Sequence, residues 1–264
     1  MSILKQKKLF LLDMDGTIYL DNDLFDGTID FLEYVKSIGG KYIFLTNNSS
    51  KSVDKYIEKM KKMGILTTED EFFTSTNATT LYLQKKNYNK IYALGTKSFT
   101  EQLRESGLNV TTEREEGIDC LCMGFDTELT FKKLEDACIL LRDDIDYIAT
   151  NPDWVCPTWY GSVPDCGSIA EMLWRATGKR PYFIGKPRPE MLNLAMERYG
   201  YSKDETVMIG DRVYTDIASG YNAGVDTIFV LSGEGTMADA ENTDTKPTYI
   251  FDNIREVYNT ITKD

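Results

Sequence analysis

The sequence of 264 residues contains no histidine. Imidazole is the general base of Ser-His-Asp and Cys-His hydrolases and a ligand in many zinc sites, so its absence excludes those mechanisms and His-based zinc sites. A catalytic site in this chain must therefore be built from carboxylates, hydroxyls, amides and the cationic groups of lysine or arginine.

Cysteine is scarce, with five residues at irregular spacing: Cys120, Cys122, Cys138, Cys156 and Cys166. An odd number without regular spacing is typical of reduced thiols rather than of a disulfide framework. Cys120 and Cys122 lie in the alternating segment IDCLCMGF, which predicts a buried strand whose thiols pack as small apolar groups. We therefore assign no zinc site to them.

Long apolar runs and an excess of positive charge are also missing. No stretch approaches the length that crosses a membrane, so we expect a soluble cytoplasmic protein without a membrane partner. The formal net charge of -12 disfavours nucleic acid as a partner, because phosphate backbones select for surfaces rich in lysine and arginine. An anionic substrate would have to be attracted by a local cation, either a metal ion or a placed lysine.

Short apolar runs alternate along the chain with segments of helical period. Buried strands are predicted at residues 9–12, 41–45, 91–94, 120–123, 147–149, 182–185, 206–209 and 227–231. Helices are predicted at 27–38, 51–63, 78–86, 98–106, 131–141, 169–177, 189–199 and 215–222, followed by a closing segment at 249–261. This repetition predicts an α/β fold whose parallel strands are joined by right-handed crossovers.

The first predicted strand, LFLL at residues 9–12, runs directly into Asp13 and Asp15. Carboxylates at the carboxyl end of a buried parallel strand lie where open α/β sheets place their chemistry. An Asp-rich turn is the alternative, since Asp and Gly are common turn formers. Two neighbouring carboxylates require a cation, a shared proton or solvent between them.

Polar groups also follow three other predicted strands: Thr46 and Asn47 after one, Lys186 after another, and Asp211 with Asp216 after a third. In a parallel sheet these strand ends share one edge, so we expect the groups to converge. Oxygen ligands without His or Cys suit Mg²⁺, for which Asp13, the main-chain carbonyl of Asp15, and Asp211 would serve as ligands. Lys186 would balance the charge of an incoming phosphate, and the Thr46 hydroxyl would bind its oxygens.

Four motifs together carry a resemblance to a known family. They are Asp13-x-Asp15-Gly16-Thr17, Thr46-Asn47-Asn48, Gly185-Lys186-Pro187-x-Pro189, and Gly210-Asp211-Arg212 with Thr215-Asp216. In this order, and over nearly the whole chain, they resemble the haloacid dehalogenase (HAD) superfamily of aspartate-nucleophile hydrolases, and more closely its NagD-like phosphatases of class IIA. The resemblance implies a Rossmann-like core, residues 1–76 and 182–264, with an inserted α/β cap for substrate specificity, residues 77–181.

The resemblance also implies a role for each motif residue. Asp13 would be the nucleophile that forms an aspartyl-phosphate, and Asp15 the general acid and base. Thr46 and Asn47 would position the phosphate and Asp15, and Lys186 would clamp nucleophile and phosphate. Asp211 would complete the Mg²⁺ site, and Asp216 would support it.

The function expected from this resemblance is Mg²⁺-dependent hydrolysis of a small phosphomonoester, including 4-nitrophenyl phosphate. Nucleoside monophosphates, sugar phosphates and pyridoxal phosphate remain open as substrates, and a homodimer or higher homo-oligomer as the assembly. Asp15 argues against a dehalogenase, which lacks an acid at that position. A phosphotransferase or phosphomutase with the same nucleophile, or a noncatalytic binding module of the same fold, are the alternatives.

The segment 151–167 is rich in Pro, Gly, Trp and Tyr and is expected to be a long ordered loop. Trp154, Trp159 and Tyr160 would either stack on an aromatic substrate or pack in the core of the inserted module, and packing is favoured. The stretch 164–168 is either a helix N-cap or, by the resemblance, part of a specificity loop near the active-site entrance.

Overall fold

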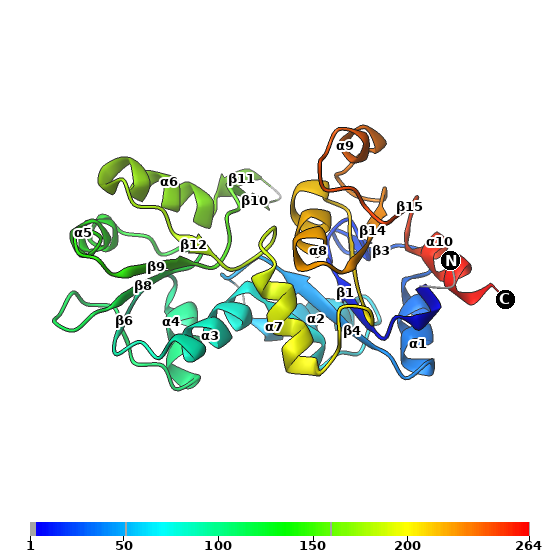
Figure 1. Ribbon diagram of the computed structural model, residues 1–264, viewed down its shortest axis with the longest axis horizontal. Coiled ribbons are helices and arrows are strands. Elements are labelled where there is room, and N and C mark those ends of the chain that lie inside the picture. The colour runs from blue at the N-terminus through cyan, green and yellow to red at the C-terminus, as the bar shows by residue number, and fades with distance from the viewer. Residues whose placement is uncertain (1–3, 51, 159, 264) are drawn as a thin grey trace. The chain divides into compact units, whose positions relative to one another are not determined.

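A computed structural model describes residues 4–50, 52–158 and 160–263 and shows two compact units (Figure 1). The first comprises the described residues of Met1–Thr46, Val53–Phe73 and Lys186–Asp264, and the second those of Asn47–Ser52 and Thr74–Gly185. The predictions for Lys51, at the start of a helix, and for Trp159 lie outside the described residues.

The first unit is built on a six-stranded sheet in the order β15-β14-β13-β1-β4-β5. The strands are β1 (Leu9–Leu12), β4 (Lys41–Thr46), β5 (Phe72–Thr74), β13 (Thr206–Gly210), β14 (Asp226–Val230) and β15 (Tyr249–Phe251). β1 is parallel to both β4 and β13, with Leu12 level with Phe44 on one side and with Ile209 on the other. From β1 the chain adds β4 and β5 on one side of the sheet, and later β13, β14 and β15 on the other side. The strand order therefore reverses between β1 and β13, which makes this position a topological switch point.

The helices of this unit are α1 (Thr28–Ser37), α2 (Val53–Lys62), α7 (Glu190–Tyr199), α8 (Ala218–Ala223), α9 (Met237–Glu241) and α10 (Ile254–Thr262). A π-helical turn, Val213–Ile217, precedes α8, and 3-10 turns lie at Leu4–Gln6 and Glu69–Glu71. The short strands β2 (Tyr19–Leu20) and β3 (Asp23–Leu24) pair with each other.

α1 packs against α10, and both cover one sheet face, where Phe10 meets Phe31 edge to face at 5.5 Å between ring centroids. Leu9 and Leu11, on the other face, are equally buried, as expected for a parallel sheet covered on both sides.

The second unit has its own parallel sheet, in the order β12-β9-β8-β6-β7. Its strands are β6 (Ile91–Leu94), β7 (Val110–Thr111), β8 (Cys120–Met123), β9 (Asp146–Ala149) and β12 (Tyr182–Phe183), and its helices are α3 (Ser75–Lys86), α4 (Lys97–Glu105), α5 (Phe131–Leu140) and α6 (Cys166–Thr177). An antiparallel hairpin joins β10 (Val155–Thr158) to β11 (Gly161–Pro164). Cys120 and Cys122 are fully buried in β8, as the alternation predicted.

The α/β class and its parallel sheets are confirmed, but some local predictions are wrong. The helix predicted at 215–222 begins as the π-helical turn Val213–Ile217 and is regular only in α8. The strand predicted at 182–185 as a return to the first sheet is shorter and pairs with β9 of the second sheet. Residues 151–167 contain a hairpin rather than a continuous loop, because Val155–Thr158 finds a partner in Gly161–Pro164. Trp154 and Tyr160 do not pack in a core, since they are 59% and 66% exposed.

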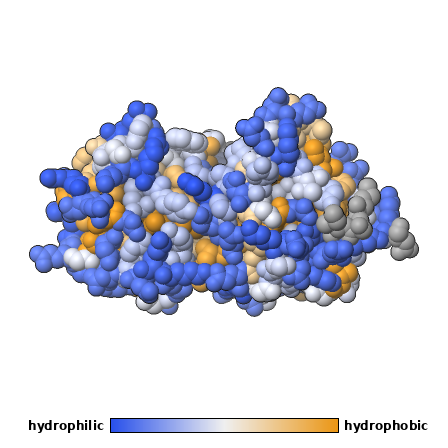
Figure 2. Space-filling model, in the orientation of Figure 1, coloured by the Kyte–Doolittle hydropathy of each residue, from blue (hydrophilic) through white to orange (hydrophobic). Residues whose placement is uncertain are grey.

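The molecular surface is mainly hydrophilic in the view of Figure 2, with small, separate hydrophobic areas. Within the described ranges, no helix combines the length and the apolar character that a membrane span requires.

Candidate active site

Asp13 stands at the carboxyl end of β1, beside the switch point of the first sheet. Its main-chain N–H donates to the carbonyl of Ile209 at 2.9 Å, which extends the pairing of β1 with β13 by one residue. The strand interpretation of residues 9–12 is thus confirmed, and the turn that contains Gly16 follows it. Asp13 therefore continues a rigid strand in the centre of the sheet.

Lys186 connects two carboxyl groups of the first unit. Its Nζ lies 2.5 Å from Oδ1 of Asp13 and 2.6 Å from Oδ1 of Asp216, and its side chain is only 3% exposed. Burial disfavours the ammonium, but Asp13 and Asp216 outweigh that effect and raise the pKa of Lys186. The two ion pairs therefore favour a protonated, buried Lys186 next to Asp13.

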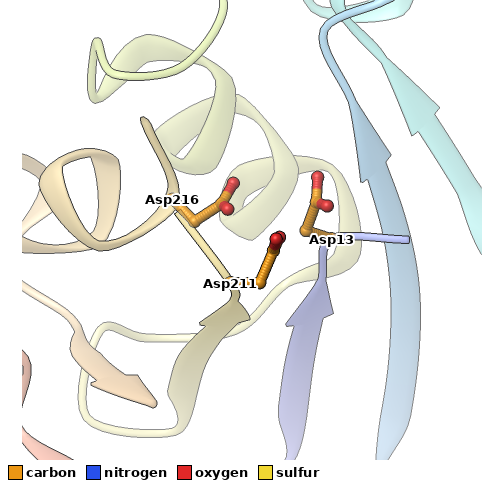
Figure 3. Close-up of side chains that lie close together, drawn as sticks. All are labelled: Asp13, Asp211 and Asp216. Carbon is orange, nitrogen blue, oxygen red and sulfur yellow. The ribbon is translucent and has the colours of Figure 1, made fainter. Parts of the chain in front are cut away.

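Asp211 and Asp216 follow β13, one directly and one in the π-helical turn (Figure 3). Oδ2 of Asp216 accepts from the main-chain N–H of Arg212 at 3.1 Å. A Cβ at Gly210 would lie 2.3 Å from the Cβ of Asp216, so only glycine allows the turn to close on the strand. Each of Asp13, Asp211 and Asp216 offers a carboxyl oxygen within 4.8 Å of the others.

The three carboxyl groups carry more negative charge than Lys186 can balance. Burial, together with the charge of Asp13, raises the pKa of Asp211 to about 6. Burial and the charge of Asp13 also raise the pKa of Asp216, while the ammonium of Lys186 acts to lower it. A bound divalent cation would stabilise the ionised form of all three groups.

The donor set fits a divalent metal site. It supplies oxygen atoms alone, which suits a hard cation such as Mg²⁺. Asp216 uses one carboxyl oxygen for Lys186 and the other for Arg212, which agrees with a supporting role beside Asp13 and Asp211. The Asp15 carbonyl as a third ligand stays a prediction.

Asp15 lies in the turn after β1, in a bridge pairing with Tyr19. Its side chain is exposed to solvent. Partial desolvation nevertheless raises the pKa of the Asp15 carboxyl group, and the nearby charge of Asp13 acts in the same direction, whereas Lys59 lowers the pKa. The upward direction favours a carboxyl group that can hold a proton.

Thr46 belongs to the first unit, and Asn47, the next residue, belongs to the second. Thr46 is the last residue of β4, two residues beyond the pairing of Phe44 with Leu12, and so lies at the same sheet edge as Asp13. Asn47 belongs to the second unit, where its Nδ2 donates to Oδ1 of Asp153 at 3.2 Å. Of the predicted residues, the structure brings Asp13, Lys186, Asp211 and Asp216 into one cluster.

Three residues near Asp211 received no role from the sequence, although Thr17 belongs to the first motif. The Thr17 hydroxyl lies 3.5 Å from Oδ1 of Asp211, the N–H of Glu234 donates to Oδ2 at 2.8 Å, and the Ser232 hydroxyl donates to the Gly16 carbonyl at 2.8 Å. For Ser232 and Glu234 the sequence signal was the short Ser-Gly-Glu-Gly segment directly after a predicted strand, at the same sheet edge as the other motifs.

Comparison with known proteins identifies the family. Residues 10–109 match the family model of haloacid dehalogenase-like hydrolases, and residues 183–257 match a second, HAD-hydrolase-like model. The acid sugar phosphatase of Staphylococcus aureus (strain USA300) is 37% identical over 254 residues, which cover 96% of this chain and 97% of that protein. This chain belongs to the haloacid dehalogenase-like hydrolases.

Solved structures of this family show the same fold. The 4-nitrophenylphosphatase of Thermotoga maritima is 40% identical, with a TM-score of 0.91 over 98% of this chain and 99% of that one. NagD of E. coli K-12 is 27% identical, with a TM-score of 0.87 over 95% and 98%. The NagD-like resemblance is confirmed, and within the HAD family the chain is a phosphatase, a hydrolase of phosphoric monoesters.

Proposed function

We propose that this chain hydrolyses small phosphomonoesters with Mg²⁺ as cofactor, through an aspartyl-phosphate on Asp13. The observation that carries the proposal is the position of Asp13 at the switch point, held by the buried ammonium of Lys186 and beside Asp211. The names of relatives, an acid sugar phosphatase and a 4-nitrophenylphosphatase, support sugar phosphates as natural substrates and 4-nitrophenyl phosphate as a test substrate.

In the first step, a carboxylate oxygen of Asp13 attacks phosphorus while the bond from phosphorus to the ester oxygen breaks. Asp15 gives its proton to the departing oxygen. In the second step, Asp15 takes a proton from water, whose oxygen attacks phosphorus and breaks the bond to Asp13. Inorganic phosphate leaves, and both carboxyl groups return to their starting protonation states.

The remaining predicted residues hold the reacting groups in place. Lys186 fixes the orientation of the Asp13 carboxylate and attracts the phosphate in a chain of net charge -12. Thr46 and Asn47 bind phosphate oxygens and position Asp15. Asp13, the Asp15 carbonyl and Asp211 would hold Mg²⁺, supported by Asp216, and the ion supplies positive charge that neutralises the phosphoryl group.

Residues 77–181 are proposed as the cap that decides which phosphomonoester is accepted. This range contains β6, β7, β8 and β9 of the second sheet, whose hydrophobic core is separate from that of the first unit, so the region can vary without disturbing the first sheet. We further propose a homodimer or higher homo-oligomer, which sedimentation equilibrium would test by a mass above that of the 30.1 kDa chain.

The experiment that tests the mechanism is a panel of phosphomonoesters assayed for phosphate release with Mg²⁺ and with chelator. We expect release by the native chain with Mg²⁺ and none by Asp13→Asn, while Asp252→Asn, an exposed aspartate, behaves as the native chain. Release that persists in Asp13→Asn or in chelator would overturn the mechanism. Adding alcohols as acceptors separates hydrolysis from phosphotransfer, because transfer yields a new ester in place of phosphate.

A further inference from the structure

The segment Ser232–Gly235, between β14 and α9, surrounds Asp211 with main-chain groups. The N–H of Glu234 donates to Oδ2 of Asp211 at 2.8 Å, and the N–H of Gly235 donates to its main-chain carbonyl at 3.0 Å. One loop therefore holds both the side chain and the backbone of a predicted metal ligand.

Glycine allows this loop to approach so closely. A Cβ on Gly233 would lie 2.0 Å from Oδ2 of Asp211, and a Cβ on Gly235 would lie 2.3 Å from the carbonyl oxygen of Asp211. Gly16, in the loop after β1, also lies against this carboxylate, since a Cβ on it would lie 2.4 Å from the same Oδ2 and 3.0 Å from the Cα of Gly233. The two loops thus meet at one carboxylate oxygen.

Ser232 joins these two loops. Its hydroxyl donates to the carbonyl of Gly16 at 2.8 Å, across 216 positions of sequence, and the serine is partly buried. Gly16 follows Asp15, and Ser232 lies two residues before Glu234, whose N–H binds Asp211. Loss of the hydroxyl would leave a carbonyl without this donor at the point where the loops meet.

We propose that Ser232 is a positioning residue of the phosphatase site, which sets the spacing between the loop that carries Asp15 and the carboxylate of Asp211. The proposal rests on the proposed function, because it acts on the groups assigned there to the metal and to proton transfer. Ser232 itself takes no part in bond making. Its effect is to hold Asp211 and the Asp15–Gly16 backbone at the separation that a shared divalent cation requires.

The test compares Ser232→Ala with Ser232→Thr, which keeps a hydroxyl, and with Ser106→Ala as matched control. Ser106 is partly buried and donates to the carbonyl of Leu103 at 2.7 Å, in the second unit and outside the site. Binding of Mn²⁺ is measured by electron paramagnetic resonance without substrate, and kcat and KM with 4-nitrophenyl phosphate at saturating Mg²⁺.

We expect Ser232→Ala to weaken Mn²⁺ binding about tenfold and to lower kcat with little change in KM. Ser232→Thr should restore most of both quantities, and Ser106→Ala should match the native chain. Unchanged Mn²⁺ affinity in Ser232→Ala, or a Ser232→Thr variant as impaired as the alanine, would overturn the positioning role. A native chain that releases no phosphate would instead overturn the proposed function, and the Mn²⁺ titration would still decide the role of Ser232.

Discussion

Lys186 is buried with a full positive charge, and its partners explain why the chain tolerates this. Two carboxylates contact its ammonium at 2.5 and 2.6 Å, so the cost of removing the cation from water is offset by strong local attraction. The same contacts hold Asp13 in one orientation. At the scale of single residues, the ion pairs that offset the burial of Lys186 also orient the carboxylate that we propose as the nucleophile.

Replacement of Lys186 by methionine should destabilise the protein. Loss of the cation leaves Asp216 buried beside Asp13 without a counter-charge, and we expect the free energy of unfolding to fall by about 3 kcal/mol. Urea denaturation at neutral pH measures the change. The double variant Lys186→Met with Asp216→Asn should recover part of the loss, and a single variant as stable as the native chain would contradict this account.

Gly233→Ala should impair metal binding more than folding. The added methyl group would meet Oδ2 of Asp211 at 2.0 Å, so the carboxylate must rotate away from its position. We expect a fall in Mn²⁺ affinity and in phosphate release. Gly107→Ala is the control, because its Cβ meets nothing within 4 Å and its positive φ should lower stability alone; equal activities in the two variants would count against the steric explanation.

Two carboxyl groups, those of Asp216 and Asp165, are positioned at the start of a helical element. The π-helical turn before α8 brings Asp216 back to the N–H of Arg212, where a regular helix had been predicted from residue 215. Asp165 caps α6 by accepting from the N–H of Cys166. Both carboxyl groups are buried by the turn that begins a helix.

The cap of α6 should make stability depend on pH. Burial raises the pKa of Asp165 to about 6, although its hydrogen bonds with Cys166 and Asn151 act the other way. The native state therefore binds more protons than the unfolded chain between about pH 4 and 6, and stability falls as pH rises through that window, by about 3 kcal/mol in total.

The difference between the native chain and Asp165→Asn isolates this effect from other carboxyl groups. Urea midpoints at pH 4.5 and 7 should show a steeper loss of stability in the native chain than in Asp165→Asn. Parallel pH dependence in both proteins would exclude Asp165 as the cause.

At the scale of the whole molecule, the net charge of -12 opposes the approach of a phosphate dianion. In the proposed mechanism the attraction comes from Lys186 and a divalent cation at the Asp13–Asp211 site, both of which act at short range. We expect kcat/KM for 4-nitrophenyl phosphate to rise as potassium chloride increases from about 10 to 150 mM at saturating Mg²⁺, because salt screens the long-range repulsion first. A fall in kcat/KM over that range would mean that local cations already steer the substrate from a distance.

The sequence by itself determined the α/β class, many of its elements and which carboxylates and lysine converge. Apolar runs of four or five residues and helical periods are local patterns, so β1, β6, β8 and α7 were predicted to within one residue. The motif residues Asp13, Lys186, Asp211 and Asp216 were predicted to converge because parallel strand ends share an edge, and the structure places them together.

Tertiary structure decided what depends on distant partners. The short strand β12 has the pattern of either sheet, and only its pairing with β9 assigns it to the second. The segment 232–235 marks a loop after a predicted strand, but the partner of Ser232 is decided by tertiary structure, since its hydroxyl meets the carbonyl of Gly16 only after β14 and β1 have taken their places on either side of β13. Periodicity encodes which residues are buried, whereas contacts between loops arise from the order of strands, which no local pattern contains.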